Sequence, residues 1–205
     1  IAMSVPVSNT AIDETNVNLQ ALVVALFGTG MANLLNKWML SGSVLTKNVV
    51  APKGPFVDAI TTPAVTVAKA GTVTWANIIA LETAVQKKHM PVTGTSGFVC
   101  STSMLAELRT TLKSANVAGY IAESVGKGTW EIDGYPVFVS EDVDDNTIEF
   151  GVFEYDLLGQ FGTVRMIIDP YTDAKKNITR FVFHTRWDNV VLRPEAFAAL
   201  VRATA

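Results

Sequence analysis

The segment Gly28–Asn33 contains the residue types of a nucleotide-binding loop. Gly28 and Gly30 match the first two glycines of the dinucleotide fingerprint, in which backbone N–H groups meet a pyrophosphate. That loop must follow a strand and open a helix, whereas these glycines lie inside a helical pattern of apolar residues. Asn33 also occupies the position of the last glycine or alanine. The segment therefore favours helix–helix crowding or a bend, and it does not predict a nucleotide site.

The acidic run from Asp142 to Asn146 contains the oxygen ligands that Ca²⁺ prefers. The run lacks the loop glycine and the distant bidentate glutamate of a calcium loop, so we interpret it as a solvated hairpin turn. The two histidines, His89 and His184, have no cysteine or acidic neighbour at ligand spacing, which argues against zinc. No metal-binding residue is therefore predicted.

The single cysteine, Cys100, ends the apolar run Phe98–Cys100 and is expected to be a buried core residue, not a nucleophile. One cysteine excludes an internal disulfide and fits a reducing cytoplasm. The chain has neither a G-x-S-x-G elbow nor a P-loop. We therefore predict no catalytic residue, no cofactor-binding residue and no cofactor, so the chain is not expected to be an enzyme.

The composition is apolar for a folded, soluble protein. Of the 205 residues, 49% are hydrophobic and 17% are charged, against about 25% charged in average domains. The 16 basic and 19 acidic residues give a net charge of −3 and are mixed, which argues against a dedicated nucleic-acid-binding protein. The longest apolar run, Ala21–Phe27, is far shorter than the ~20 residues of a membrane span. The surplus apolar surface is expected to line contacts between subunits.

The stretch Thr15–Leu40 is predicted to form one long helix, on which the rest of the chain is organised. Asp13, Glu14 and Thr15 supply acidic and capping groups at its start, Lys37 lies in its last turn, and Ser41-Gly42 supplies a stop. At ~1.5 Å per residue the helix spans roughly 35–40 Å, the breadth of a small domain. Its apolar residues recur at steps of three and four: Leu19, Leu22, Val23, Leu26, Phe27, Met31, Leu34, Leu35 and Trp38.

The remaining pattern predicts an α+β chain with an inserted middle module. Strands are expected at 1–7, 65–68, 97–100, 137–139, 148–150, 164–168 and 178–191, and helices at 75–88 and 104–113. The periodicity of 119–127 is ambiguous, and 196–201 fits a short helix or a strand. Because an α/β middle lies between the long helix and the late strands, we expect two modules. One contains the long helix and the late strands, and residues 56–150 form a second module inserted into it.

The order of several short motifs resembles that of the major capsid proteins of tailed bacteriophages, the Hong Kong 97-type fold. The resemblance covers nearly all 205 residues. The matching pieces are Val5-Pro6-Val7-Ser8 with Asp13 and Leu19, Leu40-Ser41-Gly42, Pro52-Lys53-Gly54, Val99-Cys100-Ser101-Thr102 with Leu105 and Leu108, Asp133-Gly134-Tyr135-Pro136-Val137, Ile148-Glu149-Phe150-Gly151-Val152-Phe153, Arg186-Trp187-Asp188-Asn189 and Arg193-Pro194-Glu195-Ala196-Phe197.

The resemblance implies a structural subunit of an icosahedral phage or prophage capsid, which self-assembles into the shell around the genome. It implies a peripheral domain (1–55, with the spine helix at 15–40, and 151–192) and an axial domain (56–150 and 193–205). The implied partners are other copies of the chain, scaffold or portal components, and genomic DNA enclosed without specific binding, with no membrane. The implied location is the virion, with assembly in the cytoplasm of the bacterial host.

In the same family an N-terminal arm and an extended loop precede the position of Ile1. Without them, this chain is expected to form monomers or small ring-like oligomers and not closed shells. In the type member a loop lysine bonds covalently to an asparagine, assisted by a glutamate seven residues later. Asn177 resembles that asparagine, but His184 stands in place of the glutamate and the loop lysine is missing, so crosslinking is not expected.

Two alternatives to a viral capsid remain at the level of the sequence. The first is an encapsulin-like compartment shell, which has the same fold without a virus. The second is a small α/β enzyme using the middle module, which a deep polar pocket with perturbed carboxylates or a histidine would support.

The two largest apolar surfaces of the flanking segments predict how the long helix packs. Leu19, Val23, Leu26 and Leu34 are expected against Phe181 and Phe183 of the late strands. Truncating Leu26 to alanine is expected to cost about 2–5 kcal/mol if that side chain is fully buried.

Overall fold

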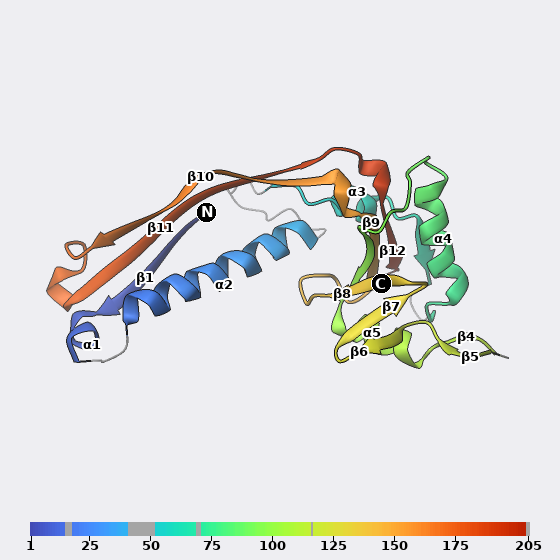
Figure 1. Cartoon of the computed structure of the whole chain (residues 1–205), viewed down its shortest axis with the longest axis horizontal. Coiled ribbons are helices and arrows are strands. Elements are labelled where there is room, and N and C mark those ends of the chain that lie inside the picture. Colours follow the sequence, from blue (N-terminus) through green and yellow to red (C-terminus); the bar gives the residue numbers. More distant parts are fainter. Residues whose placement is uncertain (15–17, 41–51, 69–70, 116, 204–205) are drawn as a thin grey trace. The chain divides into compact units, whose positions relative to one another are not determined.

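The computed structural model describes residues 1–14, 18–40, 52–68, 71–115 and 117–203. The chain divides into two compact units. The smaller unit contains residues 1–36 and 158–188, and the larger unit contains residues 37–157 and 189–205. Both units mix helices and strands, as the sequence predicted, and each is built from segments far apart in the chain (Figure 1).

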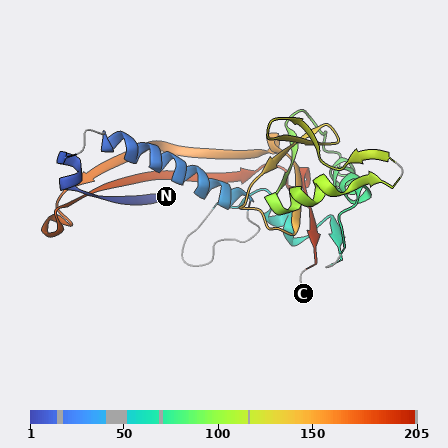
Figure 2. The same ribbon diagram turned by 90° about the horizontal axis from the view of Figure 1, so that it is seen from below.

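The smaller unit is a three-stranded sheet with a helix on one face (Figures 1 and 2). The strand order is β1-β11-β10, and β1 runs antiparallel to β11 with Met3 opposite Phe183. Burial alternates along β11, so that Phe181 and Phe183 face the helix and His184 and Arg186 face the other way. The elements are β1 (Ala2–Ser8), α1 (Asn9–Glu14), α2 (Leu19–Leu40), β10 (Asp156–Asp169) and β11 (Ile178–Val191).

The long helix α2 ends at Leu40, as predicted, but its first residue is Leu19. Asn18 caps it, because its Oδ1 accepts a hydrogen bond of 3.1 Å from the backbone N–H of Ala21. The predicted caps Asp13 and Glu14 belong instead to the separate short helix α1. The predicted start at Thr15 and the predicted stop at Ser41-Gly42 lie outside the described residues.

One stripe of α2 packs on the sheet. Val23 and Phe27 form a buried cluster with Phe181 and Phe183, and Met31 packs against it. The predicted burial of Leu26 is wrong: its side chain is 56% exposed. A helix turns about 100° per residue, so Val23, Phe27 and Met31, which are four residues apart, lie on one side of α2. Leu26 lies about 100° around the helix from Phe27 and therefore points away from the narrow sheet. Leu19 and Leu34 are half-buried and lie outside the cluster.

The larger unit is built on a seven-stranded sheet of order β2-β12-β9-β3-β8-β7-β6. A separate hairpin and three helices complete it (Figure 1). The sheet strands are β2 (Val65–Val67), β3 (Ser96–Cys100), β6 (Glu123–Gly126), β7 (Thr129–Ile132), β8 (Tyr135–Val139), β9 (Thr147–Val152) and β12 (Phe197–Arg202). The other elements are α3 (Val57–Thr61), α4 (Trp75–Gln86), α5 (Thr102–Thr110), β4 (Leu112–Ser114) and β5 (Val117–Tyr120).

The ends of α4 and α5 follow from local hydrogen bonds. Thr74 and Asn77 form a capping box at the start of α4, and Ser101 accepts a bond from the N–H of Met104 at the start of α5. The hydroxyls of Thr110 and Thr111 both donate to the carbonyl of Glu107, and α5 ends there. The predicted helix to residue 113 is therefore too long. Leu112, which falls within the predicted helix, lies on β4 and is 47% exposed.

Two segments that the sequence left open are strands. Residues 117–120 and 123–126 form β5 and β6. The C-terminal segment forms β12, which lies between β2 and β9, pairing in parallel with β2 and antiparallel to β9. Its first four residues, from Phe197 to Leu200, are all buried, because both faces of this strand are covered.

Candidate functional site

The glycines of the rejected nucleotide loop lie inside α2, where a phosphate-binding turn cannot form. A Cβ atom added at Gly30 would lie 2.9 Å from Cε of Met3 on β1, whereas Gly28 has open space around it. The crowding at Gly30 is thus between a helix and a strand, not between two helices as predicted. Its role is to let α2 approach β1 closely.

The acidic run lies in the loop that joins β8 to β9, and this loop is not a hairpin. Strand β3 lies between β8 and β9 and pairs with both, so the hairpin prediction is wrong. The loop lies at the start of α5, where the Asp145 carboxylate accepts a 2.5 Å bond from Ser103 and the Glu141 carboxylate accepts one from the N–H of Thr102. The hydroxyls of Ser103 and Ser101 lower the pKa of Asp145. These carboxylates stabilise the helix start.

The other candidate ligands are scattered. His89 follows α4 in a left-handed conformation, and His184 is exposed in the middle of β11. In the described part of the chain, no three His, Cys, Asp or Glu side chains gather as a metal site would require. None of the described helices combines the length and hydropathy that a membrane crossing requires.

Asn177 holds a turn together. It adopts a left-handed conformation with φ of 54°, directly before β11. Its Oδ1 accepts a 2.9 Å bond from the Asn9 amide, and its Nδ2 donates to the Thr10 hydroxyl. His184 is seven residues further along an extended strand, about 23 Å away at ~3.3 Å per residue, so it does not contact Asn177 of the same chain.

Cys100 and Glu149 are buried side by side in the larger unit. Burial, with a smaller contribution from Glu149, raises the pKa of Cys100 to about 12, which leaves a thiol and not a nucleophilic thiolate at neutral pH. Burial alone raises the pKa of Glu149 well above its usual range. Neither carboxyl oxygen of Glu149 has a hydrogen-bond partner among the described residues. This buried group could not be predicted from the sequence, because a single glutamate between Ile148 and Phe150 is typical of a strand with one face in solvent.

Two cavities are large enough to hold a small molecule. One, of about 890 Å³, lies on the sheet of the smaller unit, and the other, of about 450 Å³, lies beside α3 and α4. Neither is lined by a carboxyl group whose pKa is raised: those groups are Glu82, Glu149 and Asp156. The larger cavity includes His184, but no carboxyl group or cysteine of the described residues lines it beside that histidine, so neither cavity supports the α/β-enzyme alternative.

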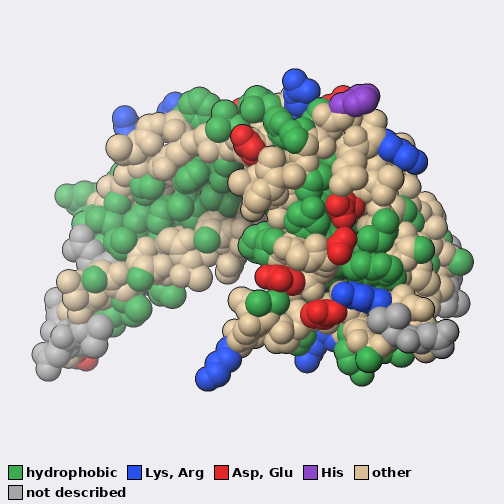
Figure 3. Space-filling model, turned by 45° about the vertical axis from the view of Figure 1, so that its right-hand side comes forward, with side chains coloured by type: hydrophobic (Ala, Val, Ile, Leu, Met, Phe, Trp, Pro, Cys, Tyr) green, Lys and Arg blue, Asp and Glu red, His purple; other side chains and the backbone are tan. Residues whose placement is uncertain are grey.

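Exposed apolar side chains are the most prominent surface feature. Figure 3 shows broad areas of apolar side chains on both units. On β10 they follow one another over most of the strand: Leu157, Leu158, Phe161, Val164, Met166, Ile167 and Ile168 are each at least 37% exposed. A strand at the edge of a sheet with this composition is typical of a surface that binds another protein chain.

Three solved structures illustrate the similarity of the fold. The capsid of a native GTA particle matches with a TM-score of 0.74 and 20% identity, over 100% of this chain and 72% of that one. Microbacterium phage Oxtober96 matches with a TM-score of 0.77 and 16% identity, over 99% and 72%. The holo-SrpI encapsulin complex from Synechococcus elongatus PCC 7942 matches with a TM-score of 0.68 and 16% identity, over 98% and 72%. These likenesses confirm the predicted capsid fold.

Comparison by sequence identifies the family. No curated protein matches the chain. The model of the phage capsid family matches residues 1–201, which is nearly the whole chain. Together with two units whose surfaces suit contact between chains, this match means that the protein belongs to the phage capsid family and is a structural capsid subunit.

Proposed function

We propose that this subunit builds the closed icosahedral shell of a tailed phage or prophage, and that the shell encloses double-stranded DNA. The observation that carries the proposal is the family match over residues 1–201. The subunit acts by self-association and has no catalytic step of its own. Scaffold and portal components are its other partners, DNA is enclosed without specific binding, and assembly takes place in the cytoplasm of the bacterial host.

The two units have different roles in this proposal. The smaller unit, with α2 and the three-stranded sheet, is the peripheral domain, and the larger unit is the axial domain near the centre of each capsomer. The division of the chain into two units, at residues 36–37, 157–158 and 188–189, supports this assignment. The boundaries at 56, 150 and 193 that the resemblance implies stay a prediction. Asn177 is then a residue of the peripheral domain with a structural role, and we propose that it forms no covalent crosslink.

An encapsulin-like compartment is the second candidate, because the SrpI encapsulin complex has a similar fold with a TM-score of 0.68. The two candidates differ in what the shell contains. Particles would be purified from cells that express the chain with its neighbouring genes, identified by mass spectrometry and treated with nuclease. Nuclease-protected double-stranded DNA is the expected result. Particles that contain one enzyme and no DNA would instead establish the compartment.

A further inference from the structure

We propose that a basic concavity on the smaller unit binds an acidic loop on the larger unit of a second copy of this chain. The proposal rests on the proposed function, self-association into a shell, and specifies one contact that joins neighbouring copies. The basic concavity is lined by Phe161, Thr163, Arg165 and Ile167 of β10 and by His184 and Arg186 of β11. The acidic loop is the segment Glu141–Asp145 between β8 and β9.

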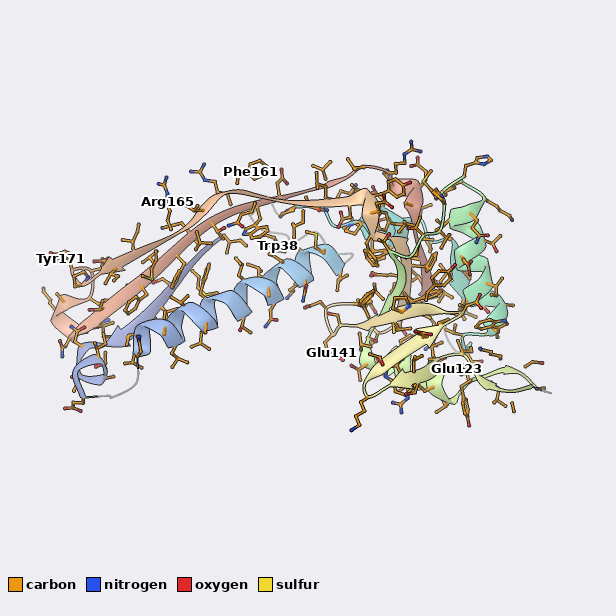
Figure 4. All side chains as sticks on the ribbon, in the orientation of Figure 1. Trp38, Glu123, Glu141, Phe161, Arg165 and Tyr171 are labelled. Carbon is orange, nitrogen blue, oxygen red and sulfur yellow. The ribbon has the colours of Figure 1, made fainter. Side chains whose placement is uncertain are left out.

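The described residues that line the basic concavity include two arginines and no carboxyl group. It lies on the sheet face opposite α2, with a volume of about 890 Å³, and Figure 4 shows Phe161 and Arg165 projecting from that face. Neither Arg165 nor Arg186 forms an ion pair within the part of the chain that the structure describes. By contrast, Arg180 on the same strand as Arg186 is paired with Asp173. An unpaired guanidinium in a concave surface is a suitable partner for a carboxylate.

The acidic loop carries four carboxylates in five residues, and none of them forms an ion pair with a described residue. The loop is nevertheless held in place. Val143 is only 3% exposed, and Asp145 and Glu141 are bonded to the start of α5. A loop that is already ordered loses little conformational entropy when it binds.

Apolar groups beside the charges favour a protein partner over a nucleic acid. Phe161 and Ile167 are 61% and 52% exposed in the basic concavity. Phe138 and Val139, which lead into the acidic loop, are 52% and 42% exposed. Both surfaces therefore combine charge with apolar side chains, and their charges are opposite. The phosphate backbone of a DNA duplex would match the arginines but would offer nothing to Phe161 and Ile167.

A second copy is the occupant because each chain carries both surfaces. When one surface of a subunit binds a different surface of the next, the contact is head-to-tail, and repeated rotation closes it into a ring. Rings of subunits are the expected building units of a shell. Charge complementarity at such a contact sets which surfaces meet and in what register.

The test is a charge swap. R165E/R186E reverses the basic concavity and D142K/D144K reverses the acidic loop; Asp145 and Glu141 are kept because they bond to α5. Association at micromolar concentration is measured by sedimentation velocity and light scattering at low and high salt. Each double variant is expected to associate about tenfold more weakly or worse, and the chain that combines all four substitutions is expected to recover to within about threefold of wild type. High salt should weaken the wild-type contact.

K175E/K176E is the matched control, because it makes the same charge change in the smaller unit outside the concavity, and it should associate like wild type. Thermal unfolding of every variant separates a lost contact from a lost fold. If wild type associates and both reversals associate equally well, or if the four-substitution chain is no better than the double variants, the proposed contact is overturned while self-association stands. Wild type that stays monomeric at every concentration, even at low salt, would also overturn the contact, because the basic concavity and the acidic loop would then not bind each other.

Discussion

Phe27 on α2 and Phe183 on β11 stack with their ring centroids 4.3 Å apart and their planes 13° from parallel. The pair lies in the buried cluster that joins the helix to the sheet in the smaller unit. Few other buried apolar side chains support this contact, since the second face of the sheet is exposed. The stability of the smaller unit therefore depends on this aromatic pair more than the stability of a unit with a larger core would.

Replacing Phe27 with alanine is expected to destabilise the smaller unit by about 3–5 kcal/mol, because the change leaves a cavity and removes the stacked partner of Phe183. Leu26→Ala is the matched control. Since Leu26 is 56% exposed, its truncation should change the free energy of unfolding by less than about 1 kcal/mol in the unassembled chain. Urea unfolding followed by circular dichroism measures both. Equal losses for the two variants would contradict the packing described for α2.

Glu149 predicts a pH dependence of stability. Its folded pKa lies above the unfolded value, so between the two the native state binds more protons and the stability falls as pH rises from about 4.5. The slope is on the order of 1.4 kcal/mol per pH unit over that interval. Glu149→Gln removes the titrating group. The stability of this variant relative to wild type should therefore be greater at pH 8 than at pH 4. The free energy of unfolding across this pH range is the measurement.

Glu195→Gln provides the control for that experiment, because Glu195 is an exposed carboxyl in the same unit. Its substitution should leave the pH dependence unchanged. If wild type and Glu149→Gln keep a constant difference from pH 4 to pH 8, Glu149 does not remain protonated in the folded chain.

Glu107 joins three segments of the larger unit. Its two oxygens accept bonds of 2.6 and 2.7 Å from Arg202 on β12, and one also accepts from the N–H of Val73. Glu107→Ala is expected to cost about 1–3 kcal/mol, since it leaves a mostly buried guanidinium and a backbone donor unpaired. The exposed pair Lys53–Asp58 gives the comparison: Asp58→Asn should cost less than about 1 kcal/mol. Thermal or urea unfolding of both variants distinguishes the two cases.

The stability lost on replacing Asn177 is expected to depend on its left-handed backbone conformation as well as on its side-chain amide. Asn177→Ala is expected to cost about 1–2 kcal/mol, because alanine is strained at a φ of 54° and both side-chain bonds are lost. Asn177→Gly loses the same bonds without that strain and should cost less. Denaturing electrophoresis of assembled particles should show single chains. A ladder of covalent multimers abolished by either substitution would show that Asn177 forms crosslinks after all.

Much of the fold could be predicted where one periodicity dominates. The strand β11 was predicted with its observed bounds, because Phe181, Phe183 and their neighbours alternate without a break. The end of α2 at Leu40 was predicted from the Ser41-Gly42 pair that follows the periodic apolar residues. The buried face of α2 could not be predicted, since Val23 and Leu26 are equally apolar. Only the width of the sheet decides which of these two side chains is buried.

The larger unit shows what the sequence alone leaves open. The run Phe197–Leu200 is apolar at every position, so it has neither helical nor strand periodicity, and its place between β2 and β9 depends on long-range pairing. The same is true of β3, which separates β8 from β9. The two surfaces proposed to meet between copies could not be recognised in the sequence for a further reason. Arg165 and Arg186 are 21 residues apart in the chain, and only the sheet brings them to one face.

The place of β12 within its sheet also constrains the order of events during synthesis. Strand β9 is complete long before residues 197–202 leave the ribosome, yet β12 is its partner on one edge and is also the strand that pairs with β2. Until then β9 presents an open hydrogen-bonding edge, and the core around Phe197 is unfilled. A nascent or prematurely terminated subunit consequently lacks a finished larger unit. The pairing of β12 with β9 and β2 therefore couples a finished larger unit to the synthesis of residues 197–202.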